Sequence, residues 1–178
     1  AYALRKQGKK VLAVDFDSQA NLTACYGIEN TGELENTIGH LMMAAIEDEK
    51  LPAMKKCIRT EDGVDFIPSS IYLSAVDAKL RLEMGAEKIL SEILDPLREK
   101  YDYILIDTCP SLGMLTINAL AAADEVIIAV NPQLLAMMGL QDYLRTVTKI
   151  RRRINPKLKI AGILMTMCEA RTNLCRTL

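Results

Sequence analysis

The sequence lacks the features that would point to a membrane, secreted or zinc-binding protein. No apolar run reaches the length of a membrane span, and the first residues do not resemble a signal peptide. The cysteines are odd in number and widely scattered, and they form neither a CxxC pair nor a His/Cys cluster of zinc spacing: Cys25, Cys57, Cys109, Cys168 and Cys175. We therefore expect reduced thiols of a cytosolic protein.

Charge of one sign is also lacking. The net charge is −1, from 22 Lys and Arg and 23 Asp and Glu, so any attraction to nucleic acid or a membrane must come from a local patch. Histidine occurs once, and His40 lies beside Ile38 and Leu41, which favours a place on a helix surface over a catalytic role. Half of the residues are apolar and a quarter are charged, as in globular proteins.

The two ends of the chain predict a partial domain. Residues 1–7 are typical of the last turns of a helix, and Gly8 is a natural stop before a buried strand. The last residues, RTNLCRTL, end without a closing element. We expect one partial domain over residues 1–178 that is cut at both ends, and this length is enough for a hydrophobic core.

Five apolar runs alternate with helical patterns. The expected strands are 11–16, 64–67, 103–107, 125–130 and 158–165, and the expected helices are 37–50, 73–82, 86–100, 115–123 and 140–153. This alternation predicts an α/β fold with a parallel sheet covered by helices on both faces. Ligands of such sheets bind at the carboxyl ends of the strands.

Two of the expected strands end in acids. Asp107 follows four apolar residues, and Asp15 and Asp17 lie at the end of the first strand. A carboxylate at the tip of a buried strand is held rigidly and can orient a hydrated Mg²⁺. Asp, Ser and Asn are also turn formers, so spacing alone leaves a metal site and a plain loop equally open.

Several segments resemble the ParA-type partition ATPases, in order and over almost the whole chain. DFDSQANLT is similar to their DxDPQ(A/G)N segment, and DTCPSLGMLTINAL is similar to D(T/C)PPSLGLLTINAL. IPSSIYLSAVDAKL, VIIAVNPQLLAMMGL and GILMTMCEARTNL resemble three further segments of that family. The resemblance implies the P-loop NTPase fold of the ParA-like, deviant-Walker branch.

The resemblance also implies roles for five residues. Asp17 would position or activate the attacking water, Asp107 would be the Walker B acid that holds Mg²⁺ through water, and Asp15 would help to fix the Mg²⁺ shell. Thr166 falls where relatives contact adenine. Arg171 matches an arginine on the family's nonspecific DNA-binding face, where a guanidinium can grip phosphate with two hydrogen bonds, although a solvated surface arginine is an equal alternative.

The departures from the family pattern concern the phosphate site. The loop KGGxGKT is absent, and with it the first strand, the P-loop lysine and the Mg²⁺-binding threonine. Binding of ATP by this chain alone is therefore not expected. Ser18, Cys109 and Ala129 each stand where the family has proline.

The function implied for the parent protein is ATP hydrolysis with Mg²⁺, ATP-dependent homodimerisation, nonspecific binding of double-stranded DNA and stimulation by a ParB-type partner. The location implied is the bacterial cytoplasm and nucleoid, with no membrane. Two alternatives stay open: a non-enzymatic remnant that acts as an interaction fragment, and a MinD-like septum-positioning ATPase. The MinD-like protein would need a C-terminal amphipathic helix, which this sequence does not show.

One basic cluster has two explanations. It contains Lys149, Arg151, Arg152, Arg153, Lys157 and Lys159. It could add to a DNA-facing patch, or it could be the charged last turn of a helix, where cations suit the helix dipole. The sequence pattern favours the helix terminus.

Overall fold

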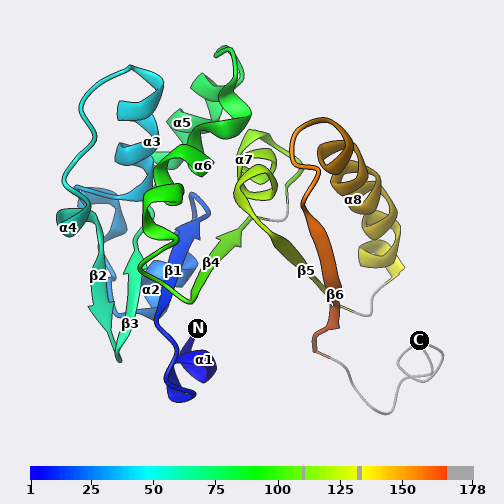
Figure 1. Cartoon of the computed structure of the whole chain (residues 1–178), viewed down its shortest axis with the longest axis horizontal. Coiled ribbons are helices and arrows are strands. Elements are labelled where there is room, and N and C mark those ends of the chain that lie inside the picture. The colour runs from blue at the N-terminus through cyan, green and yellow to red at the C-terminus, as the bar shows by residue number, and fades with distance from the viewer. Residues whose placement is uncertain (110, 132–133, 168–178) are drawn as a thin grey trace. The chain divides into compact units, whose positions relative to one another are not determined.

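The computed structural model describes residues 1–109, 111–131 and 134–167 (Figure 1). The chain divides into two compact units, residues 1–122 (unit 1) and residues 123–178 (unit 2). Each unit is an α/β arrangement built around parallel strands, as the sequence predicts. In the described part of the chain, none of the helices combines the length and hydropathy needed for a membrane span.

Unit 1 contains most of the elements. In chain order they are α1 (Tyr2–Lys6), β1 (Val11–Phe16), α2 (Asn21–Cys25), η1 (Thr31–Glu33), α3 (Ile38–Ile46), α4 (Met54–Cys57), β2 (Arg59–Glu61), β3 (Val64–Ile67), α5 (Leu73–Leu80), η2 (Ala86–Lys88), α6 (Ile89–Leu94), η3 (Asp95–Leu97), β4 (Tyr103–Thr108) and α7 (Met114–Ala122).

The sheet of unit 1 has the order β2-β3-β1-β4. β1 lies between β3 and β4 and is parallel to both, and all six of its residues are buried. β2 runs antiparallel to β3. Asp62 and Gly63 make the turn between them with positive φ angles of 50° and 73°, as a two-residue hairpin turn requires.

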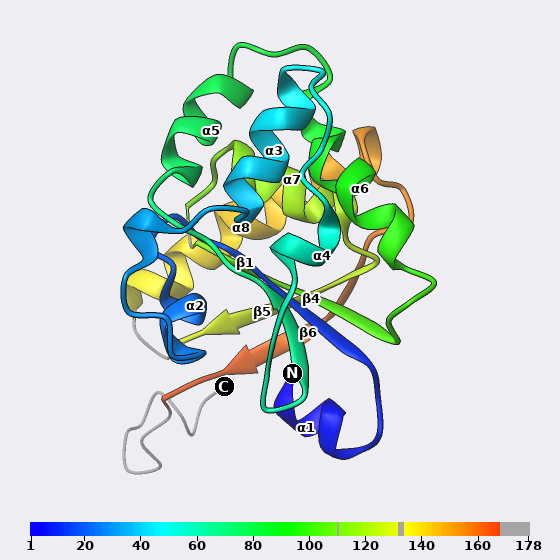
Figure 2. The ribbon, with the colours of Figure 1, turned by 90° about the vertical axis from the view of Figure 1, so that its left-hand side faces the viewer.

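Helices cover both faces of this sheet (Figure 2). On one face Leu12, Val14 and Phe16 of β1 belong to a core cluster with buried residues of α3, α5, α6 and α7. On the other face Val11 and Ala13 pack in a smaller cluster with side chains of α1 and α2. The alternation follows from the two-residue period of a strand, and it places every second residue of β1 on the α2 side.

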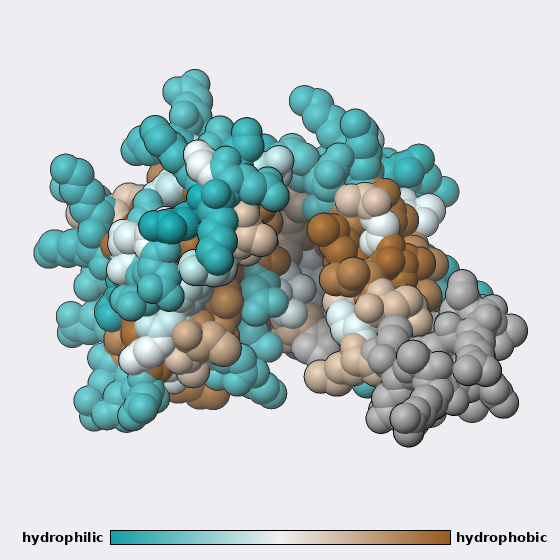
Figure 3. Space-filling model, turned by 90° about the horizontal axis from the view of Figure 1, so that it is seen from below, coloured by the Kyte–Doolittle hydropathy of each residue, from teal (hydrophilic) through white to brown (hydrophobic). Residues whose placement is uncertain are grey.

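Unit 2 consists of β5 (Glu125–Val130), α8 (Leu134–Arg153) and β6 (Lys159–Met165). β5 and β6 pair in parallel, and Ile128 and Val130 of β5 are buried, as are Val147 and Ile150 of α8. Other hydrophobic side chains stay exposed, including Ile127, Ile163 and Leu164. Figure 3 shows hydrophobic surface on this unit beside hydrophilic surface.

The structure corrects several predicted elements. A polar loop was expected over residues 17–21, and α2, which begins at Asn21, was not predicted, nor were α4 and β2. The expected helix 86–100 is divided into η2, α6 and η3, and α6 ends before Pro96, which lacks the N–H of a continuous helix. The expected helix 140–153 begins earlier, at Leu134.

Candidate functional site

The carboxyl ends of β1 and β4 bring three acids together. Asp15 and Asp107 are direct partners in the parallel register, one pair before Phe16 and Thr108. Asp17 follows two residues after Asp15, and its N–H donates to Asp15 Oδ1 at 3.3 Å. The predicted meeting of Asp15, Asp17 and Asp107 at one edge of the sheet is therefore what the structure of unit 1 shows.

Asp15 is turned inward and is fully buried. Its Oδ2 accepts hydrogen bonds from Thr23 N at 2.7 Å and from Thr23 Oγ1 at 2.6 Å. Burial raises the pKa of Asp15, and the hydrogen bonds from Thr23 and Asp17 oppose that rise. With three donors on its two oxygens, this carboxylate is suited to fixing the chain around the site.

Asp107 is the more exposed acid of the register pair. Its side chain is exposed, and none of the described residues donates a hydrogen bond to its carboxylate. Its pKa is raised, first by partial burial and then by the negative charges of Asp15 and Asp17. A raised pKa from like charges at a strand end is typical of a functional site, because a bound cation would relieve the repulsion.

Thr23 is a site residue that the sequence analysis did not single out. It lies in α2 and is fully buried, and besides its bonds to Asp15 its Oγ1 accepts a hydrogen bond from Ser69 N at 2.9 Å. It therefore joins the ends of β1 and β3 to α2. The signal was present in the sequence, since Thr23 closes the segment DFDSQANLT, but a threonine in a polar segment is not distinctive by itself.

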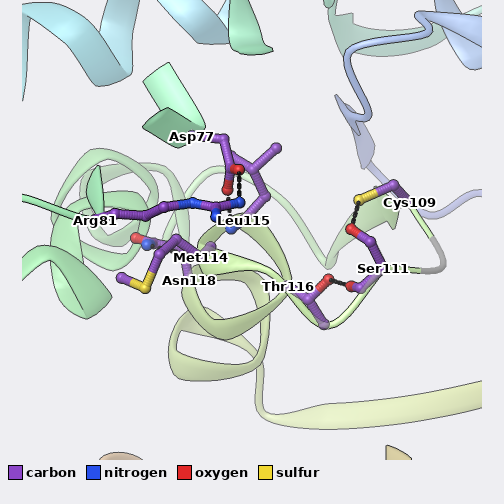
Figure 4. Close-up of polar contacts among 8 residues, drawn as sticks. All are labelled: Asp77, Arg81, Cys109, Ser111, Met114, Leu115, Thr116 and Asn118. Carbon is purple, nitrogen blue, oxygen red and sulfur yellow. Dashed lines mark hydrogen bonds and ion pairs between the residues drawn. The ribbon is translucent and has the colours of Figure 1, made fainter. Parts of the chain in front are cut away.

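The segment after β4 is braced from α5 and α7 (Figure 4). Asp77 of α5 accepts a hydrogen bond from Leu115 N, in the first turn of α7, at 3.4 Å and forms an ion pair with Arg81 at 2.7 Å. Thr116 Oγ1 donates to the carbonyl of Ser111. These contacts fix Ser111 and the first turn of α7.

The two remaining predicted residues lie apart from this group of acids in the sequence. Thr166 belongs to unit 2, where its N–H donates to Val130 O at 2.8 Å at the carboxyl ends of β5 and β6. This is the edge of a parallel sheet at which ligands bind. Arg171 lies outside the described residues.

The three acids can be compared with the ligands that Mg²⁺ requires. Among residues 1–109, 111–131 and 134–167, no group of three or more His, Cys, Asp or Glu side chains is arranged to hold a metal ion. Mg²⁺ in nucleotide sites keeps several waters and needs only one or two carboxylates beside the phosphates. The exposed Asp107 fits that requirement, whereas the oxygens of the buried Asp15 already accept three hydrogen bonds.

Comparisons with known proteins agree with this geometry. A family model described as an AAA domain matches residues 1–160. A crystal structure of cobyrinic acid a,c-diamide synthase from Mycobacterium smegmatis, with bound ATP analog and magnesium, is 33% identical, with a TM-score of 0.88 over 99% of this chain and 70% of that chain. The fold is thus that of the P-loop NTPases of the ParA type.

Two curated relatives indicate which branch of these NTPases the chain resembles. The sporulation initiation inhibitor protein Soj of Bacillus subtilis (strain 168) is 39% identical over 94% of this chain and 64% of its own length. The chromosome partitioning protein ParA of Caulobacter vibrioides (strain NA1000 / CB15N) is 34% identical over 97% of this chain and 63% of its own. The chain belongs to the ParA/MinD-type family of partitioning ATPases, and it spans between 52% and 64% of the length of the curated relatives it matches.

Proposed function

We propose that this chain is part of an ATPase domain that hydrolyses Mg-ATP and functions in DNA partitioning. The observation behind the proposal is the pairing of Asp15 with Asp107 in register, with Asp17 beside them, at the carboxyl ends of two parallel strands. Units 1 and 2 would form one such domain, and the family model supports this because its match extends across both.

The three acids would divide the work of the site. Asp107 would hold Mg²⁺ through water, and Asp17 would orient the water that attacks the γ-phosphate. Asp15 would act as a positioning residue, since its buried carboxylate fixes Asp17 through the Asp17 N–H and fixes α2 through Thr23. Bound Mg²⁺ would neutralise charge that develops on the phosphates. Thr166 would contact adenine.

The partners follow from the same family. The whole protein would form an ATP-dependent homodimer, bind double-stranded DNA without sequence preference through Arg171, and respond to a ParB-type protein. Solved relatives with bound ATP analog or ADP and magnesium support the nucleotide and the metal. The cytoplasm, in association with the nucleoid, would be the place of action.

ATP hydrolysis by the protein as its gene encodes it tests the proposal. We expect Asp17→Asn and Asp107→Asn to lower kcat by at least a hundredfold, since each removes a group that acts on the reacting phosphate. Glu83→Gln is the control, because Glu83 is an exposed acid outside the site. Equal rates for all four proteins would refute the assignment, and absence of hydrolysis in the unchanged protein would favour the non-enzymatic interaction fragment.

Calorimetric titration of the 178-residue chain with ATP and Mg²⁺ tests the role of the missing phosphate loop. We expect no binding, because the sequence contains no Gly-rich KGGxGKT loop whose backbone N–H groups could surround the phosphates. Binding that Asp107→Ala abolishes would show that residues of this chain make a phosphate site of another kind.

A further inference from the structure

The chain as a whole is nearly neutral, but its two units have net charges of opposite sign. Residues 1–122 contain thirteen Lys and Arg against nineteen Asp and Glu, which gives a net charge of −6. Residues 123–178 contain nine against four, which gives a net charge of +5. A polyanion would therefore be attracted to unit 2 and repelled by unit 1.

The positive charge of unit 2 is concentrated where α8 ends and β6 begins. Six exposed cations lie within eleven residues, and we call them the basic face: Lys149, Arg151, Arg152, Arg153, Lys157 and Lys159. In the part of the chain that the structure describes, none of the six has an acidic partner within ion-pair distance. Their charge is therefore available to a ligand.

The backbone beneath the basic face is held firmly. Leu158 is buried between the two exposed lysines, and Val147 and Ile150 anchor the end of α8. Asn155 Nδ2 donates to Ala123 O at 2.7 Å, and the N–H groups of residues 154 and 155 both donate to Ile150 O. The cations are thus presented from a fixed turn, which lowers the entropy cost of binding.

An open depression of about 570 Å³ lies within the basic face. Arg151, Lys157 and Lys159 line it together with Asp124 and Glu125. The two acids would repel a phosphate enclosed in the depression, so phosphates would contact the three cations from the solvent side. A repeating phosphate backbone that passes over the surface fits this arrangement better than one buried phosphate.

The helix dipole explains only part of the basic face. Cations in the last turn of α8 offset the partial negative charge of the helix end, and Arg151, Arg152 and Arg153 occupy that turn. The dipole acts within about one turn, whereas Lys157 and Lys159 lie beyond the helix. These lysines add charge that helix stability does not require.

We propose that the basic face binds the phosphate backbone of double-stranded DNA, as a contact surface additional to Arg171. The proposal rests on the proposed function, because it assigns residues to the DNA binding expected of the family. Arginine can donate two hydrogen bonds to one phosphate, and each neutralised phosphate releases counterions, so the binding will weaken steeply with salt.

Fluorescence anisotropy of the 178-residue chain with a short labelled duplex of mixed sequence tests the proposal over a range of salt concentrations. The test variant is the triple change Arg151→Gln, Lys157→Gln and Lys159→Gln. We expect it to bind about tenfold or more weaker, with a slope of log K against log salt that is shallower by roughly 2 to 3. The matched control removes three exposed cations of unit 1, Lys50→Gln, Lys55→Gln and Lys56→Gln, and should bind like the unchanged chain.

The outcomes separate the two proposals. Loss of affinity and slope in the test variant, with an unchanged unfolding midpoint, supports the basic face. If the unchanged chain binds DNA and the test variant binds equally well, the basic face is refuted while DNA binding survives, and an acidic protein would be the partner to seek. If the unchanged chain does not bind DNA at low salt, the basic face is refuted, whereas the DNA binding proposed for the whole protein is judged by the same titration of that protein with ATP.

Discussion

Replacing Thr23 by valine tests whether α2 positions the acids of the site. The valine side chain has nearly the same volume, but it cannot donate to Asp15 Oδ2 or accept from Ser69 N, which lie 2.6 and 2.9 Å from Thr23 Oγ1. A buried polar group left without its partner costs about 1–3 kcal/mol. Ser69 N loses the acceptor Thr23 Oγ1, and Asp15 Oδ2 loses one of its two donors and keeps the N–H of residue 23. We therefore expect the free energy of unfolding to fall by about 2–4 kcal/mol.

Urea unfolding at neutral and at acidic pH measures this loss. The hydrogen bonds from Thr23 oppose the rise in the pKa of Asp15, so in Thr23→Val the folded-state pKa rises further above the unfolded value. The cost of a raised carboxyl pKa is present above the folded-state pKa and disappears as the pH falls below it. The loss should therefore be larger at neutral pH, and Thr23→Ser, which keeps the hydroxyl, should lose no more than about 1 kcal/mol. Equal losses for serine and valine, or a loss independent of pH, would contradict the reasoning.

Two further predictions concern charge and buried hydrogen bonding. Asp107→Asn should raise the free energy of unfolding near neutral pH by roughly 0.5 kcal/mol, the size of a solvent-screened charge interaction, because it removes a carboxylate whose pKa is raised by burial and by its acidic neighbours. Thermal unfolding should show this gain shrinking as the pH falls through that raised pKa, and a gain at acidic pH alone would be the wrong sign. Asn118→Ala should cost about 2–4 kcal/mol, since the buried amide donates to Ala86 O at 2.8 Å and accepts from Leu90 N at 3.1 Å. Urea unfolding measures this loss, with the exposed Asn30→Ala as the control. Equal losses of unfolding free energy in the two variants would contradict the role of Asn118.

The strands were the elements that the sequence predicted best. The runs 11–16, 64–67 and 125–130 have the bounds that the structure shows, since each is an apolar segment enclosed by polar or turn-forming residues. Gly8 before the first and Pro68 after the second act through backbone geometry, which local sequence determines. The structure has a positive φ of 78° at Gly8, as the end of a helix requires.

The sequence analysis did not predict α2, the helix that supplies Thr23 to the site. α2 has only five residues, too few to show a helical period, and its sequence contains turn formers that predict a loop. What holds α2 in place is the pair of hydrogen bonds from Thr23 to Asp15, eight residues earlier, and the one from Ser69, 46 residues later. Contacts of that range are not visible in a local pattern.

The same limit applies to the individual acids. The sequence placed Asp15 and Asp107 at the ends of two strands, and the structure adds that these strands are neighbours and that the two acids are register partners. It could not predict that Asp15 is buried while Asp107 is exposed, because that depends on the cover that α2 supplies over Asp15. The roles of Asp15, Asp17 and Asp107 toward metal and water stay predictions.

The prolines that this chain lacks around the site are compensated by hydrogen bonds. Ser18 leaves the segment after β1 without a fixed φ angle, but Asp17 Oδ1 accepts from Gln19 N at 3.0 Å and Asp17 O accepts from Ala20 N at 3.0 Å. Cys109 likewise has its sulfur 3.0 Å from Ser111 Oγ. A ring restricts the unfolded chain as well, whereas hydrogen bonds act in the folded state alone. Near Asp17 and at Cys109 the folded chain therefore relies on hydrogen bonds, without the restriction that a proline ring would also place on the unfolded chain.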